Sequence, residues 1–336
     1  MNCHLLVPEL FWPAAAGAEP YRGLALPALE TLLARGARTR VGGASLERWL
    51  GAAHGFSAEL PLAPYSLRGD GVEPGDHWWL RADPVHLKVH GDRLVLADAS
   101  RLEPTADEAR QYVATLNAHF AGEGMTFVAP GPLRWYARVA SEPRLGTLPT
   151  TEVAGRSVAS FLPSGSDGAR WRKAVNEMQM LLHDHPCNSA REARGQLPVN
   201  SIWLWGGGRE GRPATPYGGA WADHPLVAGL AAASGFPARP LPASGALLDT
   251  RGGGTQLVVL ASLPMPAYGD LPRWREALAA LEQNWFAPLL NGLQKRAIES
   301  LTLHGLGPDF GYASEIRPRD RWRFWRARRP LHAYAA

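Results

Sequence analysis

Groups that could bind an anion are concentrated in one short stretch, residues 181–209. Its sequence, LLHDHPCNSAREARGQLPVNSIWLWGGGR, ends in three consecutive glycines and an arginine. Arginine guanidinium groups and the amides of a glycine turn are groups with which proteins bind phosphate and carboxylate. The candidate ligand-binding residues are His185, Asn188, Arg191, Arg194, Asn200, Gly206, Gly207, Gly208 and Arg209.

Two interpretations of this stretch are open. In the first, its arginines and glycine-turn amides bind a small phosphorylated or acidic ligand. In the second, the same residues form a polar network that ties a helix end to a strand, because buried polar groups must be paired whatever the function. Arg191 and Arg209 could also form surface ion pairs with Glu192 and Glu210, which contribute little to stability.

The stretch HDHPCNSAREARGQLPVNSIWLWGGG resembles a motif of the archaeal-type cofactor-independent phosphoglycerate mutases, metalloenzymes of the alkaline phosphatase superfamily. It is still more similar to a bacterial branch described as regulatory proteins of the RpfE type. The resemblance implies an alkaline-phosphatase-like core with an inserted domain. In that family a serine nucleophile follows the first helix, and Ser45 is a candidate catalytic residue by position. The sequence around Ser45 offers no base to activate it, so we expect Ser45 to cap a helix.

The metal-binding segments of that family are altered in this chain. The first strand leads into Pro8 and Glu9 where the family has an aspartate, and no histidine follows strand 256–263 before His304. The pair Asp223–His224 resembles the Asp-His of the family's Gly-Asp-His motif, but it does not occur in the order that the family's motifs have, and we expect Asp223 to cap a helix instead. We therefore predict no bound metal and no cofactor. The favoured function is a non-catalytic regulatory or ligand-binding protein, and the alternative is an active phosphoglycerate mutase or related phosphotransferase.

The elements that must position these residues alternate between strands and helices, which favours an α/β fold with a mainly parallel sheet flanked by helices. Apolar spacing predicts a helix over 170–182, and Asn188 could cap a short second helix. The apolar run 202–205 is typical of a strand buried on both faces, and we expect it in the core sheet. For the C-terminal segment Arg317–Arg329, an edge strand with its arginines on one face and its aromatic residues folded inward is the favoured interpretation.

Turn signals divide the chain into two parts. Residues 1–82 and 151–336 are predicted to form the phosphatase-like α/β core, and residues 83–150 an inserted α+β domain. Within the insertion, His86, Lys88 and His90 alternate with apolar residues and would share one strand face. We expect the ligand pocket between the core and the insertion, next to the glycine turn, because small-molecule sites commonly lie in such clefts.

The composition of the chain limits the classes of protein to which it could belong. The chain has 336 residues, 46% of them hydrophobic, a formal charge of +4 and two cysteines. The charge is too small to indicate nucleic-acid binding, and the cysteines are too few for a disulfide framework. Without a signal peptide or an apolar run of about 18 residues, the sequence predicts a cytoplasmic protein without membrane contact. The Arg- and Trp-rich residues 317–329 could also bind single-stranded nucleic acid or a protein partner.

Overall fold

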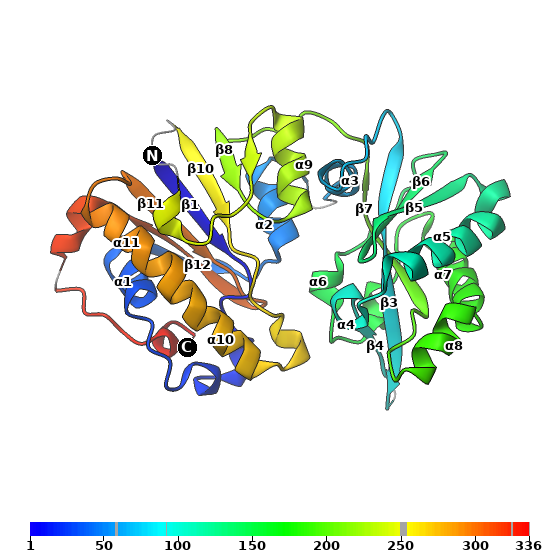
Figure 1. Cartoon of the computed structure of the whole chain (residues 1–336), viewed down its shortest axis with the longest axis horizontal. Coiled ribbons are helices and arrows are strands. Elements are labelled where there is room, and N and C mark those ends of the chain that lie inside the picture. Colours follow the sequence, from blue (N-terminus) through cyan, green and yellow to red (C-terminus); the bar gives the residue numbers. More distant parts are fainter. Residues whose placement is uncertain (58–59, 92, 249–253, 324, 336) are drawn as a thin grey trace. The chain divides into compact units, whose positions relative to one another are not determined.

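The computed structural model divides into two compact units (Figure 1). Unit 1 comprises Met1–His54 and Ala214–Ala336, and unit 2 comprises Gly55–Pro213. The structure describes residues 1–57, 60–91, 93–248, 254–323 and 325–335. The boundaries differ from those expected, because residues 55–82 and 151–213 belong to unit 2 rather than to the phosphatase-like core.

Unit 1 is built on a seven-stranded sheet with the order β2-β12-β11-β1-β10-β8-β9. Strands β1 and β8–β11 run parallel, while β12 and β2 are antiparallel to their neighbours. This arrangement confirms the predicted α/β fold with a mainly parallel sheet. Its strands are β1 (Asn2–Val7), β2 (Ala37–Gly42), β8 (Gly219–Trp221), β9 (Ala238–Arg239), β10 (Thr255–Val259), β11 (Ser300–Gly305) and β12 (Phe310–Ile316).

Helices cover one face of this sheet and form a hydrophobic core with it. Cys3, Leu5 and Val7 of the central strand β1 are fully buried against apolar side chains of α1, α10 and α11, which lie across the sheet in Figure 1. The helices of unit 1 are α1 (Pro27–Arg35), α2 (Leu46–Ala53), α9 (Pro225–Ser234), α10 (Leu271–Leu281) and α11 (Ala287–Gln294). Between α10 and α11, a π-helical turn at Glu282–Phe286 places Glu282 against α1, where its carboxylate accepts hydrogen bonds from the amides of Ala28 (2.6 Å) and Leu29 (3.0 Å).

Unit 2 contains a second, antiparallel sheet organised around one long strand, β3 (Trp78–His90). One side of β3 pairs first with β6 and then with β4, and the other side pairs with β7. The remaining elements are α3 (Ala63–Gly69), β4 (Arg93–Ala97), α4 (Ala99–Leu102), α5 (Ala106–Phe120), β5 (Met125–Gly131), β6 (Arg134–Val139), α6 (Thr150–Val153), α7 (Gly168–His183), α8 (Pro186–Ala193) and β7 (Ser201–Gly208). Helices α5, α7 and α8 pack on this sheet around a separate core.

The predicted strand at 202–205 exists, but it belongs to the sheet of unit 2. Strand β7 pairs antiparallel with β3, with Trp203 opposite Asp83. Each indole also donates within the unit: Trp205 to the Asp83 carboxylate at 2.7 Å, and Trp203 to the Leu148 carbonyl at 2.8 Å. The long strand β3 therefore offers β7 both a free edge and polar partners, and an apolar run alone cannot indicate which sheet it joins.

The Arg- and Trp-rich segment forms no strand over its described residues. Pro318–Trp322 is a 3-10 helix, started by Pro318 and by a hydrogen bond of 2.9 Å from the Arg317 amide to the Asp320 carboxylate. The predicted edge strand is therefore wrong, because a proline lacks the amide that a strand ladder needs. Trp322 and Trp325 are 63% and 69% exposed. A protein partner for residues 317–329 stays a prediction.

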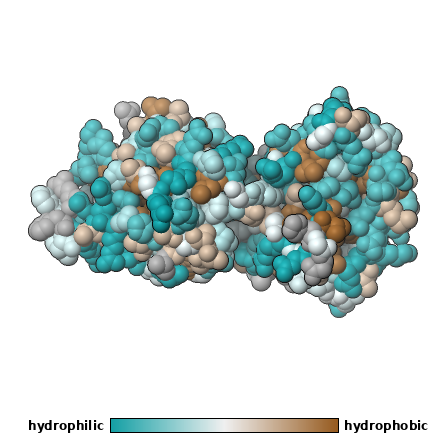
Figure 2. Space-filling model, turned by 90° about the horizontal axis from the view of Figure 1, so that it is seen from below, coloured by the Kyte–Doolittle hydropathy of each residue, from teal (hydrophilic) through white to brown (hydrophobic). Residues whose placement is uncertain are grey.

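The face seen in Figure 2 is largely hydrophilic in both units, with smaller hydrophobic patches between the hydrophilic residues. Over the described part of the chain, no helix combines the length and the apolar character needed to cross a bilayer.

Candidate anion-binding site

The three glycines at the end of β7 let the main chain pass close to bulky side chains. Gly206 has a φ of +67°, a left-handed conformation that favours glycine. A Cβ atom on Gly207 would lie 1.9 Å from the Trp78 ring, and one on Gly208 would lie 2.4 Å from Cβ of Pro61. Glycine is therefore required at these positions for packing.

A cavity of about 660 Å³ lies beside this glycine turn, within unit 2. Gly207, Gly208 and Arg209 line it together with residues from distant parts of the chain. These include a second arginine, three hydroxyl side chains, an indole and one carboxylate, from Arg144, Ser57, Thr147, Ser166, Trp78 and Glu142. Two guanidinium groups and several hydroxyls around one cavity can bind a phosphate or a carboxylate by charge-assisted hydrogen bonds.

Backbone contacts hold the loop that carries Arg144. The Arg144 amide donates to the Asp167 carboxylate at 2.7 Å, and Gly146 exchanges two backbone hydrogen bonds with Ser164. Gly165, with a φ of +93°, passes so close that a Cβ atom there would lie 2.5 Å from the Arg144 carbonyl. Because the backbone of Arg144 is fixed at both ends, its long side chain extends from a defined position on the cavity wall.

Arg209 makes only exposed contacts. Its Nη1 donates to the carbonyl of Asp76 at 2.8 Å and to its carboxylate at 3.2 Å. The side chain of Arg209 is 46% exposed and that of Asp76 is 98% exposed. Such an ion pair is worth roughly 0–1 kcal/mol, so a ligand can replace it at little cost.

Asn188 lies elsewhere in unit 2, at the junction of α7, α8 and β7. Its amide nitrogen donates to the carbonyls of Leu182 (2.6 Å) and Val199 (2.9 Å), and its oxygen accepts from the Val199 amide (2.8 Å) and the Tyr112 hydroxyl (2.5 Å). The side chain is 2% exposed. Asn188 therefore joins the two ends of the stretch, as the polar-network interpretation expects.

Arg191 and Arg194 both contact Glu108 of α5. Arg191 is fully buried, and it donates to the Glu108 carboxylate (2.7 Å) and to the carbonyls of Leu197 (2.8 Å) and Leu102. Arg194 donates to the other Glu108 oxygen at 2.8 Å, but its side chain is 52% exposed. The fold uses the guanidinium of Arg191 as a structural link between α8 and α5.

His185 and Asn200 also make local structural contacts. His185, rather than the expected Asn188, caps α8, because its Nδ1 accepts from the Cys187 amide at 3.2 Å. Burial lowers the pKa of His185, which keeps the ring neutral near pH 7. Asn200 bonds both backbone groups of Leu87 on β3, at 2.7 and 3.0 Å. Of the predicted ligand-binding residues, Gly207, Gly208 and Arg209 are those that line the cavity.

The strand face predicted to carry His86, Lys88 and His90 lies at the far half of β3, where β3 pairs with β4. His86 is half-buried, and its Nδ1 is 2.9 Å from the Pro198 carbonyl. Burial lowers its pKa. Lys88 is exposed, and the side chain of His90 lies outside the described part of the structure. None of these is among the residues that line the cavity beside the glycine turn.

Ser45 in unit 1 is the N-cap of α2, as expected. Its hydroxyl accepts a hydrogen bond from the Arg48 amide at 3.2 Å, and the residue is 8% exposed. A capping hydroxyl accepts its hydrogen bond from the helix amide, so this arrangement stabilises α2.

The sequence shows Glu9 as a single carboxylate after β1, but in the structure the charge of a second carboxylate, that of Glu47, acts on it. Glu9 follows β1 with a φ of +58°, unusual for a residue with a side chain. Burial, and to a lesser degree the charge of Glu47 on α2, raise the pKa of Glu9 to about 7. Glu47 itself is buried. No sequence signal relates these two residues, which are brought together by the packing of α2 at the end of β1.

Two histidines lie on the sheet of unit 1, on the face opposite to the one that α1, α10 and α11 cover. His304 Nε2 on β11 lies 3.2 Å from His4 Nδ1 on β1, and the Trp49 ring is 4.8 Å from the His304 ring. Burial lowers the pKa of both histidines, that of His304 to about 4. The pair is therefore neutral near pH 7 and forms a hydrogen bond between rings rather than a cationic site.

The cavity residues Arg144, Ser57 and Ser166 were not identified from the sequence. They come from loops that carry no motif, and contacts at Gly146 and Gly165 help to bring two of these loops together. The two glycines were the available signal, because a glycine permits a close approach of two backbones.

Comparisons with known proteins identify homologues of this chain. No protein-family model matches it. The chain is 24% identical over 263 residues to a probable 2,3-bisphosphoglycerate-independent phosphoglycerate mutase of Geobacter sulfurreducens, covering 71% of the chain and 65% of that protein. It is 30% identical over 212 residues to 2,3-bisphosphoglycerate-independent phosphoglycerate mutase 2 of Methanothermobacter thermautotrophicus, covering 58% and 49%.

The matched part of the chain thus spans less than two thirds of the length of either relative. Among solved structures, a protein of Pyrococcus horikoshii aligns over 95% of this chain and 89% of its own, with a TM-score of 0.55 and 14% identity. The relatives are described as 2,3-bisphosphoglycerate-independent phosphoglycerate mutases, and the α/β fold with a mainly parallel sheet is shared with the Pyrococcus horikoshii protein.

Proposed function

We propose that this protein binds a small phosphorylated or carboxylated molecule in the cavity beside the glycine turn. In this proposal it acts as a non-catalytic, regulatory relative of the cofactor-independent phosphoglycerate mutases, of the RpfE type. The observation that carries the proposal is that Arg144 and Arg209 line one cavity together with Gly207 and Gly208.

The charge distribution around the cavity supports an anionic ligand. Arg209 has only an exposed partner, so a ligand anion can take over its hydrogen bonds without breaking a buried pair. The hydroxyls of Ser57 and Ser166 can donate to further ligand oxygens. Glu142 also lines the cavity, but it is an exposed residue whose charge is screened by water.

The strand ends of unit 1 support the non-catalytic part of the proposal. A two-metal phosphotransfer site needs several carboxylates and histidines that converge on two cations. Here β10 leads into Leu260, Ala261 and Ser262, and β11 leads into Leu306 and Gly307. Asp309 uses its carboxylate to accept from the Ala14 amide at 2.8 Å. These residues do not offer the carboxylates and histidines that would bind two metal ions.

Binding measurements on variants test the proposal. Isothermal titration of the full chain with 3-phosphoglycerate and with inorganic phosphate should give saturable binding. Arg144→Ala and Arg209→Ala should each weaken it about tenfold, because each removes a charge-assisted hydrogen bond worth roughly 1.5–3 kcal/mol.

The matched control is Arg110→Ala, which removes an exposed arginine paired with Asp107 on α5. Its affinity should equal that of the unchanged protein. Equal affinity in all three variants, or an equal loss in the control, would contradict a site at the glycine turn. Far-ultraviolet circular dichroism of each variant separates a lost contact from a lost fold.

A cytoplasmic location is part of the same proposal. Cys3 and Cys187 are both free and buried, and free thiols are typical of a reducing compartment. Thiol titration of the native and the denatured protein should give no reactive thiol in the first and two in the second.

A further inference from the structure

A histidine and two glutamates of unit 2 come together although they are far apart in the sequence. The residues are His119 at the end of α5, Glu123 in the 3-10 turn Ala121–Glu123 that follows, and Glu177 on α7. Each offers one ligand atom, and these atoms all lie within 4.8 Å of one another. His119 Nε2 and Glu177 Oε2 are 3.7 Å apart. We propose that these three side chains bind one divalent transition-metal ion, with Zn²⁺ as the best-matched ion.

The fold fixes the elements that carry the three ligands. His119 and Glu123 are four residues apart in a helix that continues into a 3-10 turn, which is the spacing that puts two side chains on one face. Phe120 between them is fully buried, and its ring contacts the His119 ring edge to face at 4.8 Å. On α7, Val175 and Met178 are buried in the same core as Phe120. The ligands therefore project from packed helices rather than from free loops.

The ligand set suits a transition metal better than calcium or magnesium. Zn²⁺ binds imidazole nitrogen and carboxylate oxygen at about 2.0–2.2 Å, so two of its tetrahedral ligands lie about 3.4 Å apart. The observed 3.7 Å between His119 and Glu177 is close to that separation. An imidazole ligand favours Zn²⁺ over the hard cations, which prefer oxygen alone. Three protein ligands leave a fourth position open.

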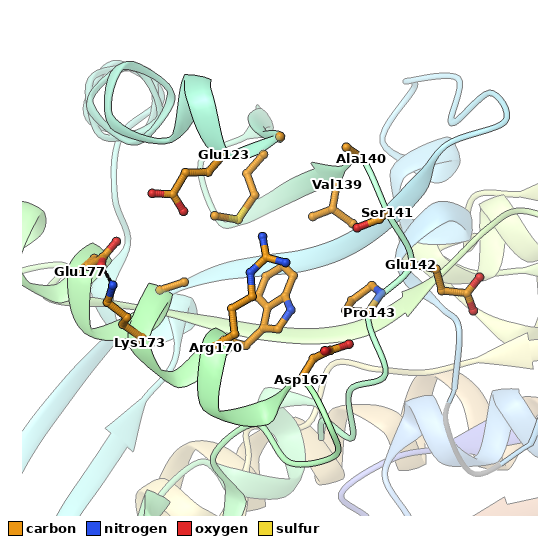
Figure 3. Close-up of a pocket in the computed structure, with 14 residues that line it drawn as sticks. Glu123, Val139, Ala140, Ser141, Glu142, Pro143, Asp167, Arg170, Lys173 and Glu177 are labelled. Carbon is orange, nitrogen blue, oxygen red and sulfur yellow. Dashed lines mark ion pairs between the residues drawn. The ribbon is translucent and has the colours of Figure 1, made fainter.

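A cavity lies next to two of the three ligands, and this second observation indicates what the open coordination position of the metal would face. Glu123 and Glu177 both line a cavity of about 330 Å³, which Figure 3 shows with Arg170 and Lys173 beside them. A metal held by these carboxylates would therefore lie at the cavity wall. The open metal position and the two cationic side chains together suit a small anion, such as a carboxylate or a phosphate ester.

The competing explanation is a set of surface ion pairs. Lys173 Nζ lies 3.5 Å from Glu177 Oε1, as the dashed line in Figure 3 marks. Lys173 is 80% exposed, however, and an exposed ion pair of this kind contributes little to stability. A divalent ion that gains three ligands can displace it. The two explanations differ in what removal of Lys173 should do, because a metal competes with its ammonium group.

Zinc titration of the full chain tests the proposal. After removal of bound metal with a chelator, isothermal titration with ZnCl₂ should give one site per chain. His119→Ala, Glu123→Gln and Glu177→Gln should each lower the zinc affinity by about tenfold or more, and Lys173→Met should raise it. With Co²⁺ in place of Zn²⁺, visible absorption bands should appear and should disappear in His119→Ala.

The control is His183→Ala. His183 is an exposed histidine on α7, the helix that also carries Glu177, and its Nε2 lies 3.9 Å from a single carboxylate, that of Asp184. Its zinc affinity should be unchanged. Unaltered affinity in His119→Ala, or the same loss in His183→Ala, overturns the proposal in favour of adventitious surface binding. Since His119 and Glu123 are exposed, thermal unfolding should be nearly the same in these variants without metal. Phosphate binding by the metal-free protein tests the glycine-turn site separately.

Discussion

The fully buried guanidinium of Arg191 donates a hydrogen bond of 2.7 Å to Glu108, a residue 83 positions earlier in the chain. This ion pair joins α8 to the start of α5 and ties the motif that resembles the phosphoglycerate mutases to the core of unit 2. The residue type that suggested an anion site is used here to hold two helices together. A second arginine, Arg194, also donates to the Glu108 carboxylate, but its side chain is exposed.

Replacing Arg191 should destabilise the protein strongly. Arg191→Met leaves the Glu108 carboxylate and two carbonyl groups without their buried donor, which should cost about 3–5 kcal/mol. Arg194→Met removes an exposed partner of the same carboxylate and should cost less than about 1 kcal/mol. Urea unfolding of both variants measures the difference. Equal losses would mean that burial of the guanidinium contributes nothing.

The same carboxylate should make stability depend on pH in the acid range. Burial would raise the pKa of Glu108, but the Thr105 amide and the two arginines outweigh it, and the pKa is lowered. A group with a lowered pKa stabilises the fold above its unfolded pKa, and that contribution is lost as the pH falls through the folded pKa. Between about pH 5 and about pH 3, the unchanged protein should therefore lose more stability than Glu108→Gln. Parallel curves for the two proteins would contradict this.

Glu9 should give a pH dependence of the opposite sign. Burial, with a smaller effect of Glu47, raises its pKa to about 7, so the folded protein binds a proton that the unfolded chain has released. Stability should therefore fall as the pH rises from about 4.5 to about 7, at up to about 1.4 kcal/mol for each unit. Glu9→Gln carries no such charge. Thermal denaturation at several pH values should show a flatter profile for this variant, and an unchanged slope would sink the assignment.

A methyl group on the glycine turn should disturb the wall of the cavity. In Gly207→Ala the new Cβ would meet the Trp78 ring at 1.9 Å, so the ring or the turn must move. Overpacking of this kind costs about 1–3 kcal/mol, and the displaced ring should also weaken phosphate binding. Gly211→Ala is the control, since its nearest atom beyond the adjacent residues, the Tyr65 hydroxyl, would be 3.8 Å away. Similar midpoints of thermal unfolding for both variants would show that the close approach has no consequence.

Phosphoglycerate mutase turnover should be undetectable with or without added Mn²⁺. The reason is that Ser45 caps α2 and that, among the residues the structure describes, the strand ends of unit 1 bring no three metal-ligating side chains together. Ser45→Ala should cost about 1 kcal/mol of stability through the lost cap and leave phosphate affinity unchanged. A coupled assay that detects turnover in the unchanged protein and none in Ser45→Ala would show that Ser45 is a nucleophile.

Local signals in the sequence predicted elements well. The cap predicted at Ser45 is confirmed, and Thr105 and Glu108 form a capping box at the start of α5. Strand β2 carries no local signal, because all its residues are exposed and no apolar alternation marks it. Helix α3 likewise lies in a proline-containing stretch. Propensity and period act over a few residues, so they identify elements with clear local patterns and pass over the others.

The candidate site could be predicted only in part. The glycine turn and Arg209 are adjacent in sequence, and the motif drew attention to both. Arg144 and Ser166 reach the same cavity because Gly146 and Ser164 pair their backbones, a contact that no local pattern encodes. The partition between the two sheets was likewise hidden, since the apolar run of β7 fits either one. Contacts between residues far apart in the sequence therefore determine which loops line the cavity and which sheet β7 joins, and the residue types alone do not indicate either.

The discontinuity of unit 1 has a consequence for the order in which the chain can fold during synthesis. The central strand β1 is made first, but its neighbours β10 and β11 are made some 250 to 300 residues later. Unit 2 is contiguous over Gly55–Pro213 and can fold as soon as it leaves the ribosome. Until β10 is synthesised, β1 and its apolar face stay without their partners, and this is the interval in which a chaperone that binds exposed apolar segments would have its target.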